Sequence, residues 1–386
     1  MEKLLINQPN AGHKITTIFF CGGGTLGPVT PLLALAEAWQ KKIPEAKLFF
    51  VGTPDGPERI LVAKAGLTFI ALPKAKLPRY WSSEWLTFPW VFLKAFLKAG
   101  SLLLRANRKQ TLIVSAGGYT AVPMILAGWF LGVRSWLHQQ DRPLLLSNKV
   151  TAPFVSLITV AWPESLKDFP TTKTKLIGNP IRSAFLSADR EAAIEYFSLN
   201  KNKPTVLVVG GGTGSQWLNE RLVEIGKDLV EEANIIHLTG KNKMIEELKN
   251  FEVDYHAFEL LNEEMPLALA AADLVVCRAG MGTITELAAT HKPAIVVPLP
   301  NSPQEDNAEI LEKNQAAIIV DQTKTTAENL FFIIRFLLAD EARRRLMGEA
   351  MAGVLRTDVA EEMVEMGQGV LSSSSLRGTR PSTCPP

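Results

Sequence analysis

The chain has few cysteines and almost no net charge, and both shortages narrow its possible functions. Its three cysteines, Cys21, Cys277 and Cys384, lie far apart with no CxxC or metal-ligand spacing. They predict free thiols in a reducing compartment, which we take to be the cytosol, rather than a disulfide framework. A net charge of +2 is too small to indicate nucleic acid as a partner. Residues 1–14 are polar and mixed, so no secretory signal is expected there.

Signatures of metal sites and of two common nucleotide-binding classes are also missing. The sequence has no DxD-like or His/Cys ligand cluster, so we predict no bound metal and no cofactor. Neither of its glycine clusters continues into Gly-Lys-Ser/Thr or forms a GxGxxG fingerprint with a following acidic residue. Simple NTPase and dehydrogenase functions are therefore disfavoured.

One uncharged run, Thr111–Val133, has about the length that a membrane-spanning helix needs. It carries Gly117, Gly118 and Pro123 in its middle, and its first half suits a buried parallel strand that turns into a helix. We therefore expect a buried strand and helix here, with a membrane helix as the alternative.

The chain does have a regular alternation of apolar, strand-like runs with helix-like segments. This alternation predicts an α/β fold with parallel sheets covered by helices on both faces, and 386 residues favour two domains over one. The alternation pauses in the polar stretch from Ser183 to Pro204 and restarts at Thr205. The expected strands are Thr17–Cys21, Leu48–Val51, Thr68–Leu72, Leu112–Ser115, Ser135–His138 and Leu157–Ala161, then one from Thr205, Asn234–Leu238, Leu274–Cys277, Ala294–Pro298 and Ala317–Val320.

Each half opens with a strand followed by a glycine turn, Gly22–Gly24 in the first and Gly210–Gly212 in the second. Glycine lets a phosphate or another backbone approach closely, and the N-terminus of the following helix offers amides to an anion. One such turn commonly serves only the packing of a strand against a helix. Two of them, one in each half, favour a ligand bound between the domains at the carboxyl ends of the strands.

Six segments resemble, in the same order, the MurG family of N-acetylglucosaminyltransferases. The resemblance covers most of the chain, from about Thr17 to Asp321. The segments are "GGGTLGPVTPLLALA", "SAGGYTAVP", "LHQQD", "IGNPIR", "VVGGGTGSQWLN", and "VVCRAGMGTITELAATHKPAIVVPLP" followed by "QEDNA".

This resemblance implies a GT-B fold, in which two Rossmann-like domains face each other across a cleft. Residues 1–182 would bind the acceptor and the membrane, residues 183–340 the UDP-sugar, and a helical segment over 341–371 would pack back on the first domain. The serine-rich tail, 372–386, is expected to be disordered.

The implied reaction is inverting and independent of metal. N-acetylglucosamine would move from UDP-N-acetylglucosamine to the undecaprenyl-diphosphate-linked N-acetylmuramoyl peptide, which converts lipid I to lipid II in peptidoglycan synthesis. The enzyme would work as a peripheral protein at the cytoplasmic face of the cell membrane.

The family's motifs assign the donor site to the second domain. Glu286 would accept hydrogen bonds from both ribose hydroxyls, although an acid there can also be an ordinary surface residue. Arg182, directed by the preceding Gly-Asn-Pro turn, would hold the diphosphate or only bridge the interdomain linker. The other implied donor residues are Met281, Gly282 and Thr283, with amides at the diphosphate, and Gln304 and Asn307, near the sugar.

The second glycine turn departs from the family's usual "GGSQGA" and reads "GGGTGSQ". The resemblance places Gly212 of this turn at the donor site, together with Thr213 and Ser215. Either Thr213 or Ser215 could replace the missing serine hydroxyl at the donor.

The first glycine loop departs further, because Pro28 stands where the family commonly has histidine. Proline cannot act as a general base. Asp141 is the most suitable substitute, since a carboxylate can take the proton of the acceptor hydroxyl, and His138 is the alternative; both could be structural instead. The acceptor diphosphate would meet the free amides of the loops at Gly23, Gly24, Thr25, Gly27, Gly118 and Tyr119.

The segment from Leu72 to Arg108 combines tryptophan with basic residues. In a helix, its last four basic residues would share one face about 80° wide. A solvated helix face is the simpler interpretation, but the combination suits an interface with anionic lipid. The residues expected at the membrane are Trp81, Trp85, Lys94, Lys98, Arg105 and Arg108.

Two other functions fit parts of the sequence. A UDP-N-acetylglucosamine 2-epimerase would share the fold and the donor but needs no membrane patch, so the segment from Lys74 to Trp90 disfavours it. A non-catalytic nucleotide-sugar-binding protein would explain Pro28, but the chain keeps Glu286, Arg182 and both glycine loops.

Overall fold

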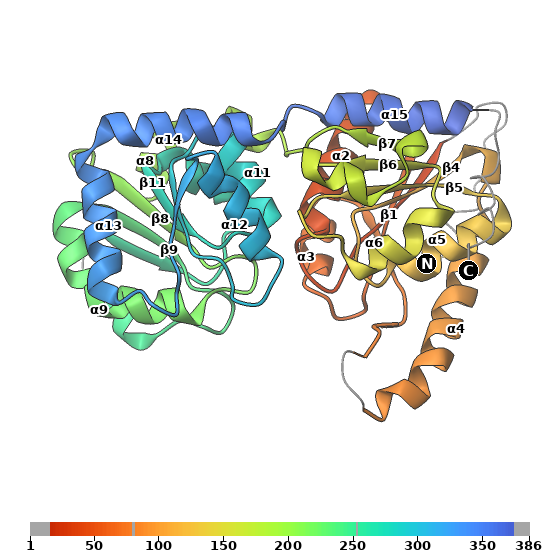
Figure 1. Cartoon of the computed structure of the whole chain (residues 1–386), viewed down its shortest axis with the longest axis horizontal. Helices are drawn as coiled ribbons and strands as arrows, with labels where there is room; N and C mark the ends of the chain where they lie inside the picture. Colours follow the sequence, from red (N-terminus) through yellow and green to blue (C-terminus); the bar gives the residue numbers. More distant parts are fainter. Residues whose placement is uncertain (1–15, 79–81, 252–253, 374–386) are drawn as a thin grey trace. The chain divides into compact units, whose positions relative to one another are not determined.

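The computed structural model describes residues 16–78, 82–251 and 254–373, and the chain divides into two units (Figure 1). The first comprises Met1–Pro180 and Asp358–Pro386, and the second comprises Ile181–Thr357. The boundary predicted after Arg182 lies two residues beyond this division, so Arg182 belongs to the second unit. The fold class expected from the sequence, α/β with parallel sheets, is confirmed.

The first unit is built on a seven-stranded sheet in the order β3-β2-β1-β4-β5-β6-β7, with every neighbouring pair parallel. The six strands expected in this unit, β1 to β6, appear within one residue at each end, and β7 was not expected. The strands of the unit are β1 (Thr17–Cys21), β2 (Lys47–Gly52), β3 (Thr68–Ala71), β4 (Thr111–Ser115), β5 (Arg134–Gln139), β6 (Leu157–Val160) and β7 (Thr174–Leu176). Its helices are α2 (Val29–Lys42), α3 (Glu58–Lys64), α4 (Glu84–Leu104), α5 (Ala121–Leu131), α6 (Leu146–Thr151) and α15 (Ala360–Ser372).

Helices cover both faces of this sheet because the central strands are apolar on both sides. Along β1, Ile18 and Phe20 point into a core shared with α2 and α15, whereas Phe19 points into the core shared with α4 and α5. All five residues of β1 are buried, as expected of a central parallel strand.

The uncharged run Thr111–Val133 forms β4, a glycine turn and α5. β4 is fully buried, and Met124 and Ile125 of α5 belong to the core. The prediction of a buried strand and helix is confirmed.

The second unit has a six-stranded parallel sheet in the order β10-β9-β8-β11-β12-β13. This order, like that of the first sheet, is the doubly wound arrangement. Its strands are β8 (Thr205–Val209), β9 (Asn234–Leu238), β10 (Tyr255–Phe258), β11 (Leu274–Cys277), β12 (Ala294–Val296) and β13 (Ala317–Ile319). Its helices are α7 (Ala184–Ser187), α8 (Arg190–Tyr196), α9 (Gln216–Glu232), α10 (Met265–Ala271), α11 (Met281–Thr290), α12 (Gln304–Lys313), α13 (Ala327–Ala339) and α14 (Glu341–Val354).

The C-terminal segment predicted over 341–371 is divided between the units. α14 packs against α11 in the second unit, whereas α15 packs against α2 and β4 in the first. Ser372, where the disordered tail was predicted to begin, is the last residue of α15. Residues 374–386 of that predicted tail lie outside the described residues.

The contact between α15 and α2 depends on a glycine. A Cβ atom added to Gly367 would lie 2.4 Å from the Cη2 atom of Trp39, which is fully buried, whereas a Cβ atom added to Gly369 would meet nothing within 4 Å. The two glycines lie on the same helix and are two residues apart. They therefore form a matched pair of sites.

We predict opposite effects of alanine at these two positions. Gly367→Ala should lower the free energy of unfolding by about 1–3 kcal/mol because the Trp39 ring must shift. Gly369→Ala should raise it by about 0.4–1 kcal/mol because alanine restricts the unfolded chain. Urea unfolding of both variants measures this, and an equal change at both sites would contradict the packing described.

Candidate functional site

Three loops of the first unit meet at the carboxyl edge of its sheet. They follow β1, β4 and β5, which are neighbours in the sheet. A Cβ atom on Gly118 would lie 2.9 Å from the Gly23 carbonyl oxygen, and one on Gly27 would lie 3.6 Å from Nε2 of Gln140. Gly118 has a φ of 88°, which only glycine adopts without strain. The loops predicted to bind the acceptor are therefore in contact.

The carboxylate of Glu58 holds the first glycine loop by a hydrogen bond. Glu58 is fully buried, and its Oε2 accepts a hydrogen bond from the Gly24 amide at 3.4 Å. Gly24 was predicted to offer a free amide to the acceptor diphosphate; in the structure this amide is already engaged. Thr25 is exposed beside it, and Pro28 is buried at the start of α2.

Tyr119 lies over the same loop. A Cβ atom on Gly24 would approach Cε1 of Tyr119 to 2.5 Å and its hydroxyl oxygen to 3.0 Å. Partial burial raises the pKa of Tyr119, and the nearby Glu58 raises it further, while a hydrogen bond with the Thr53 side chain and Lys74 act against this. Tyr119 is therefore a neutral phenol in this loop at neutral pH.

His138, the alternative candidate for the base, belongs to β5. Its side chain is buried, its Nδ1 lies 2.9 Å from Oγ1 of Thr159, and its Nε2 lies 2.8 Å from Oδ1 of Asn179. Burial lowers the pKa of His138 to about 4, against the opposing effect of these hydrogen bonds. The burial and the two hydrogen-bond partners of His138 favour a structural role, and its role as the alternative base stays a prediction without support from this geometry.

Asp141 lies just after β5 in the loop beside the first glycine loop and is half-buried. The Gln139 side chain fixes this loop, donating to the carbonyls of Asp141 at 2.7 Å and Pro143 at 2.9 Å. Asn148 in turn donates to Oε1 of Gln139 at 2.6 Å. The position of Asp141 at the carboxyl edge agrees with the prediction, whereas its role as a base stays a prediction.

In the second unit, the predicted donor residues gather at the start of α11. Gly280 precedes this helix, its first turn has no acidic residue, and no described side chain caps its amides. Thr283 and Gly282 are half-buried, whereas the Met281 side chain is buried, so Met281 offers only its backbone. A helix start of this kind favours an anion.

Glu286 and Arg182 lie close enough to interact. Partial burial raises the pKa of Glu286 to about 7, and the positive charge of Arg182 opposes this rise. Arg182 also lies over the Phe185 ring, with Cζ 5.1 Å from its centroid. The structure brings this predicted carboxylate and guanidinium together in one unit.

In the second glycine turn, Thr213 and Ser215 differ in exposure and in hydrogen-bond partners. Ser215 is buried; its hydroxyl oxygen accepts from the Leu218 amide at 3.3 Å and from Nη2 of Arg278 at 2.7 Å. Thr213 and Gly212 are exposed on the same turn. The Ser215 hydroxyl is therefore engaged within the fold, whereas the Thr213 side chain is accessible; which of the two contacts the donor stays a prediction.

Gln304 and Asn307, predicted to lie near the donor sugar, start α12. Asn307 is fully buried, and its Nδ2 donates to the Ala279 carbonyl at 3.2 Å. It supports the turn before α11 through this hydrogen bond, and its predicted place near the donor sugar stays a prediction. Gln304 is half-buried, and its Oε1 accepts from the Leu299 amide at 3.0 Å.

Arg278 and Glu58 are functional-site supports that were not predicted from the sequence. Nη1 of Arg278 donates to the carbonyls of Val297 at 3.0 Å and Pro298 at 3.2 Å, so this side chain ties the second glycine turn to the loop after β12. Their positions gave some indication of a role, since Arg278 comes directly after β11 and Glu58 begins α3, the helix after β2. The sequence does not show, however, which groups these two charged side chains contact.

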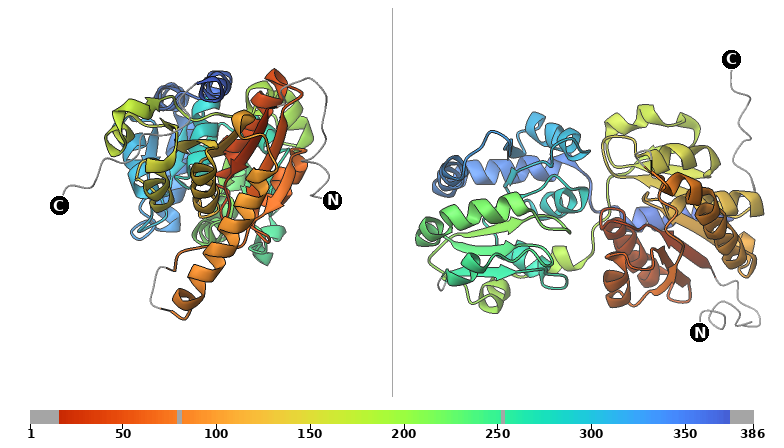
Figure 2. Two further views of the ribbon diagram at one scale, coloured as in Figure 1. Left: turned by 90° about the vertical axis from the view of Figure 1, so that its right-hand side faces the viewer. Right: turned by 90° about the horizontal axis from the view of Figure 1, so that it is seen from below.

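The predicted membrane segment contains α4, which extends beyond the rest of the first unit (Figures 1 and 2). Among the described residues, α4 is the one helix with the length and apolar composition that crossing a membrane requires. At about 100° per residue, five exposed apolar residues fall within about 60° of one another. They are Leu86, Trp90, Leu93, Leu97 and Leu104.

The basic residues flank this apolar stripe. Lys94, Lys98 and Arg105 are exposed along one of its edges. Arg108 was predicted to continue the same helical face, but α4 ends at Leu104 and Arg108 lies in a 3₁₀ turn, donating to the Leu131 carbonyl at 3.5 Å. Trp85 is 42% exposed on α4, and Trp81 lies outside the described residues.

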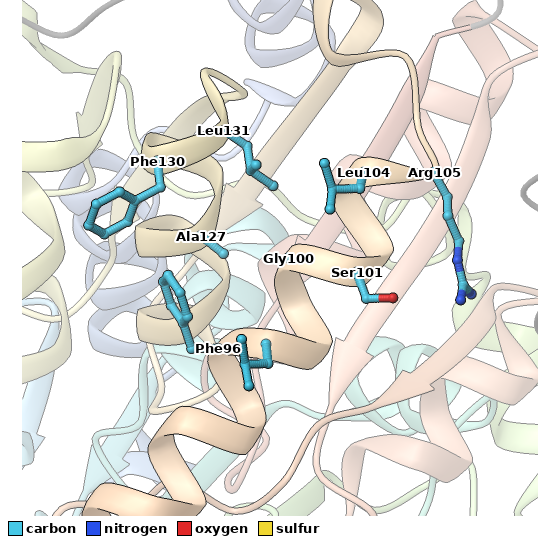
Figure 3. Close-up of a pocket in the computed structure, with 9 residues that line it drawn as sticks. Phe96, Gly100, Ser101, Leu104, Arg105, Ala127, Phe130 and Leu131 are labelled. Carbon is cyan, nitrogen blue, oxygen red and sulfur yellow. The ribbon is translucent and has the colours of Figure 1, made fainter.

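An apolar groove of about 640 Å³ runs between α4 and α5 (Figure 3). Phe96 and Leu104 line it from α4, and Phe130 and Leu131 from α5, with Arg105 at its edge. Phe130 is 70% exposed. The exposed apolar surface therefore continues from α4 onto α5.

Comparison with protein families gives matches in both units. The N-terminal domain of glycosyltransferase family 28 matches residues 18–160, and the C-terminal domain of the same family matches residues 205–363. The two matches include every loop described above.

Two bacterial relatives are similar over nearly their whole length. Each is named UDP-N-acetylglucosamine–N-acetylmuramyl-(pentapeptide) pyrophosphoryl-undecaprenol N-acetylglucosamine transferase. The protein from Clostridium perfringens (strain SM101) is 34% identical over 324 residues, which cover 83% of this chain and 89% of the relative. The protein from Desulfitobacterium hafniense (strain Y51) is 32% identical over 363 residues, 90% of this chain and 98% of the relative.

Solved structures share the fold. Acinetobacter baumannii MurG has a TM-score of 0.69 at 24% identity and covers 92% of this chain and 99% of its own. A Listeria monocytogenes protein described as a UDP-N-acetylglucosamine 2-epimerase has a TM-score of 0.68 at 11% identity, covering 92% of this chain and 95% of its own. The architecture alone therefore does not separate a transferase from an epimerase.

Proposed function

Because the chain belongs to the MurG family of glycosyltransferase family 28 and has its GT-B fold, we propose that it converts lipid I to lipid II. It transfers N-acetylglucosamine from UDP-N-acetylglucosamine to the undecaprenyl-diphosphate-linked N-acetylmuramoyl peptide. The observation that carries the proposal is the identity of 32–34% with transferases of this name, over 89–98% of their length. The epimerase that shares the fold is only 11% identical to this chain in sequence.

In the proposed donor site, the second unit holds the nucleotide sugar. The amides at the start of α11 and the Arg182 guanidinium take the diphosphate, and the Glu286 carboxylate accepts hydrogen bonds from the ribose hydroxyls. Thr213 supplies the hydroxyl that Ser215 cannot, since Ser215 is bound to Arg278. Asn307 supports this arrangement through Ala279, and Gln304 lies at its margin.

In the proposed acceptor site, the loops of the first unit hold the lipid-linked sugar, with Gly23, Thr25, Gly27 and Gly118 close to its diphosphate. The acceptor hydroxyl attacks the anomeric carbon, the bond from that carbon to UDP breaks, and UDP leaves with the electron pair. Asp141 takes the proton of the attacking hydroxyl. Its support is its place in the loop beside the first glycine loop, together with the engagement of His138 in the core.

A transfer assay with Asp141→Asn tests the function and the base together. With labelled UDP-N-acetylglucosamine and the lipid-linked acceptor, the wild type should form labelled lipid II, whereas epimerised or unchanged UDP-sugar would contradict the proposed function. Asp141→Asn should lower turnover by about 10²–10⁴ with donor affinity nearly kept. A rate within about twofold of the wild type would exclude Asp141 as the base.

Glu286 predicts a pH dependence of donor affinity. With its pKa at about 7, Glu286 gains charge as the pH rises from 6 to 8, and only the charged form accepts from both ribose hydroxyls. Donor affinity should therefore rise up to about tenfold over this range, since a hydrogen bond to a charged group contributes about 1.5–3 kcal/mol. The diphosphate diester of UDP-N-acetylglucosamine does not titrate there.

Calorimetry of Glu286→Gln checks this prediction. The variant should bind the donor about tenfold to a hundredfold more weakly at pH 8 and show no pH dependence. The control, Glu305→Gln, removes an exposed acid from the first turn of α12 and should keep the wild-type profile. Unchanged affinity in Glu286→Gln would refute the assignment.

We also propose that α4 and the end of α5 rest on the membrane as a peripheral surface at its cytoplasmic face. The exposed apolar stripe of α4 lies opposite its buried residues, and basic residues border it, which is the arrangement of an interfacial helix. A lipid-linked acceptor requires the active site to work at such a surface.

Replacing Lys94, Lys98 and Arg105 with glutamine should weaken binding to anionic vesicles by roughly fivefold per charge at most. The control replaces Lys201, Lys313 and Lys324, exposed lysines of the second unit, so that the net charge changes equally. Sedimentation with vesicles compares the two triple variants. Equal binding by both would show that net charge, and not the α4 surface, governs attachment.

A further inference from the structure

The last residue of β5, Gln139, and the next residue, Gln140, are both buried but differ in hydrogen bonding. Their exposed fractions are 0% and 1%. Nε2 of Gln139 donates to two backbone carbonyls, and its Oε1 accepts from Asn148. In the part of the chain that the structure describes, Oε1 of Gln140 has no hydrogen-bond partner. The Gln139 amide is therefore used by the fold, whereas this oxygen of Gln140 is not.

The Gln140 amide lies against the first glycine loop, since a Cβ atom on Gly27 would be 3.6 Å from its Nε2. A second buried polar group among the described residues, Oγ1 of Thr120, also has no partner. Thr120 lies in the loop after β4 and precedes α5, but its hydroxyl does not cap that helix. The two unpartnered side chains therefore lie in the two loops that contact the first glycine loop.

A buried acceptor without a partner is costly for a fold. Such a group costs free energy, and the large majority of buried side-chain polar atoms have a partner. A fold that needed only a buried side chain of this length would be at least as stable with methionine at position 140. A binding site, in contrast, retains such a group at the expense of stability because its ligand supplies the missing partner.

The identity of the unpartnered atom indicates the chemistry of that ligand. A carboxamide oxygen only accepts hydrogen bonds, so its partner must be an O–H or an N–H. In a lipid-linked acceptor, the diphosphate oxygens are acceptors themselves, whereas the N-acetylmuramoyl sugar carries hydroxyls and an acetamido N–H. The oxygen of Gln140 therefore matches the sugar and not the diphosphate.

We propose that Gln140 is a specificity residue whose Oε1 accepts a hydrogen bond from a hydroxyl or N–H of the acceptor sugar. Because the side chain is buried against the first glycine loop, the sugar meets this oxygen when the loop shifts on binding. This inference rests on the proposed function for the identity of the acceptor. It adds that the first unit recognises the sugar through a neutral side-chain amide and the diphosphate through backbone amides.

The test compares the binding of two ligands to the full chain without donor. One is the complete lipid-linked muramoyl peptide, and the other is undecaprenyl diphosphate, which carries the diphosphate but no sugar. Gln140→Met should raise the dissociation constant of the first ligand about fivefold and leave that of the second unchanged. Equal weakening of both ligands would mean that the amide binds the diphosphate, and no change for either would also overturn the proposal.

Thermal unfolding without ligands separates recognition from support of the fold. Gln140→Met should raise the midpoint or leave it unchanged, because Oε1 loses no partner. The matched control, Gln139→Met, should lower it by several degrees, because two carbonyls and the Asn148 amide lose theirs. A lowered midpoint in Gln140→Met would show that its amide serves the fold and would overturn the proposal.

Two further measurements keep this inference apart from the proposed function. Gln140→Glu retains an acceptor oxygen at the same chain length and should keep the wild-type ratio of the two dissociation constants. The affinity of Gln140→Met for UDP-N-acetylglucosamine should stay at the wild-type value, since the donor residues lie in the other unit. Failure of the wild type to form lipid II would contradict the proposed function. The ratio of the two dissociation constants would still decide whether Gln140 recognises the sugar.

Discussion

Both proposed sites depend on how backbone amides at the carboxyl ends of parallel strands are satisfied. In the first unit, the Gly24 amide points to the buried carboxylate of Glu58, an anion that belongs to the protein. In the second unit, the N-cap residue of α11, Gly280, has no side chain to cap the helix, and the first turn has no acidic residue. The start of α2 in the first unit likewise has no side-chain cap and no acidic residue in its first turn. Both helix starts therefore favour an external anion such as a diphosphate, whereas the Gly24 amide already has a partner.

The two units share one architecture and differ in the side chains that support their glycine turns. The side chains of Arg278 and Ser215 hold the second glycine turn in place, and that of Asn307 holds the turn before α11. Glu58 and Thr53 do the same for the first glycine loop. Fewer side chains therefore remain to bind ligands than the motifs suggest. Among the residues predicted from the sequence, they are Glu286, Arg182 and Thr213 in the second unit, and Asp141 and Tyr119 in the first.

The α/β class, the two units and the buried strands followed from the sequence because buried parallel strands are continuous apolar runs between helix-like segments. β7 and β10 were missed because they are short strands at the edges of their sheets, and β7, with the sequence Thr-Lys-Leu, is half-exposed to exposed. The sequence also could not separate ligand groups from supporting ones. Ser215, Asn307 and His138 have the chemistry of site residues, and only their burial and partners show that the fold uses them.

We infer that the donor and the acceptor are bound by different units, each at the carboxyl edge of its own sheet. Amide hydrogen exchange of the whole chain with UDP-N-acetylglucosamine tests this inference. Exchange should become slower at residues 280–286 and 211–214, with little change at 22–28 and 116–120. Protection of the first glycine loop by the donor, or none at the start of α11, would contradict it.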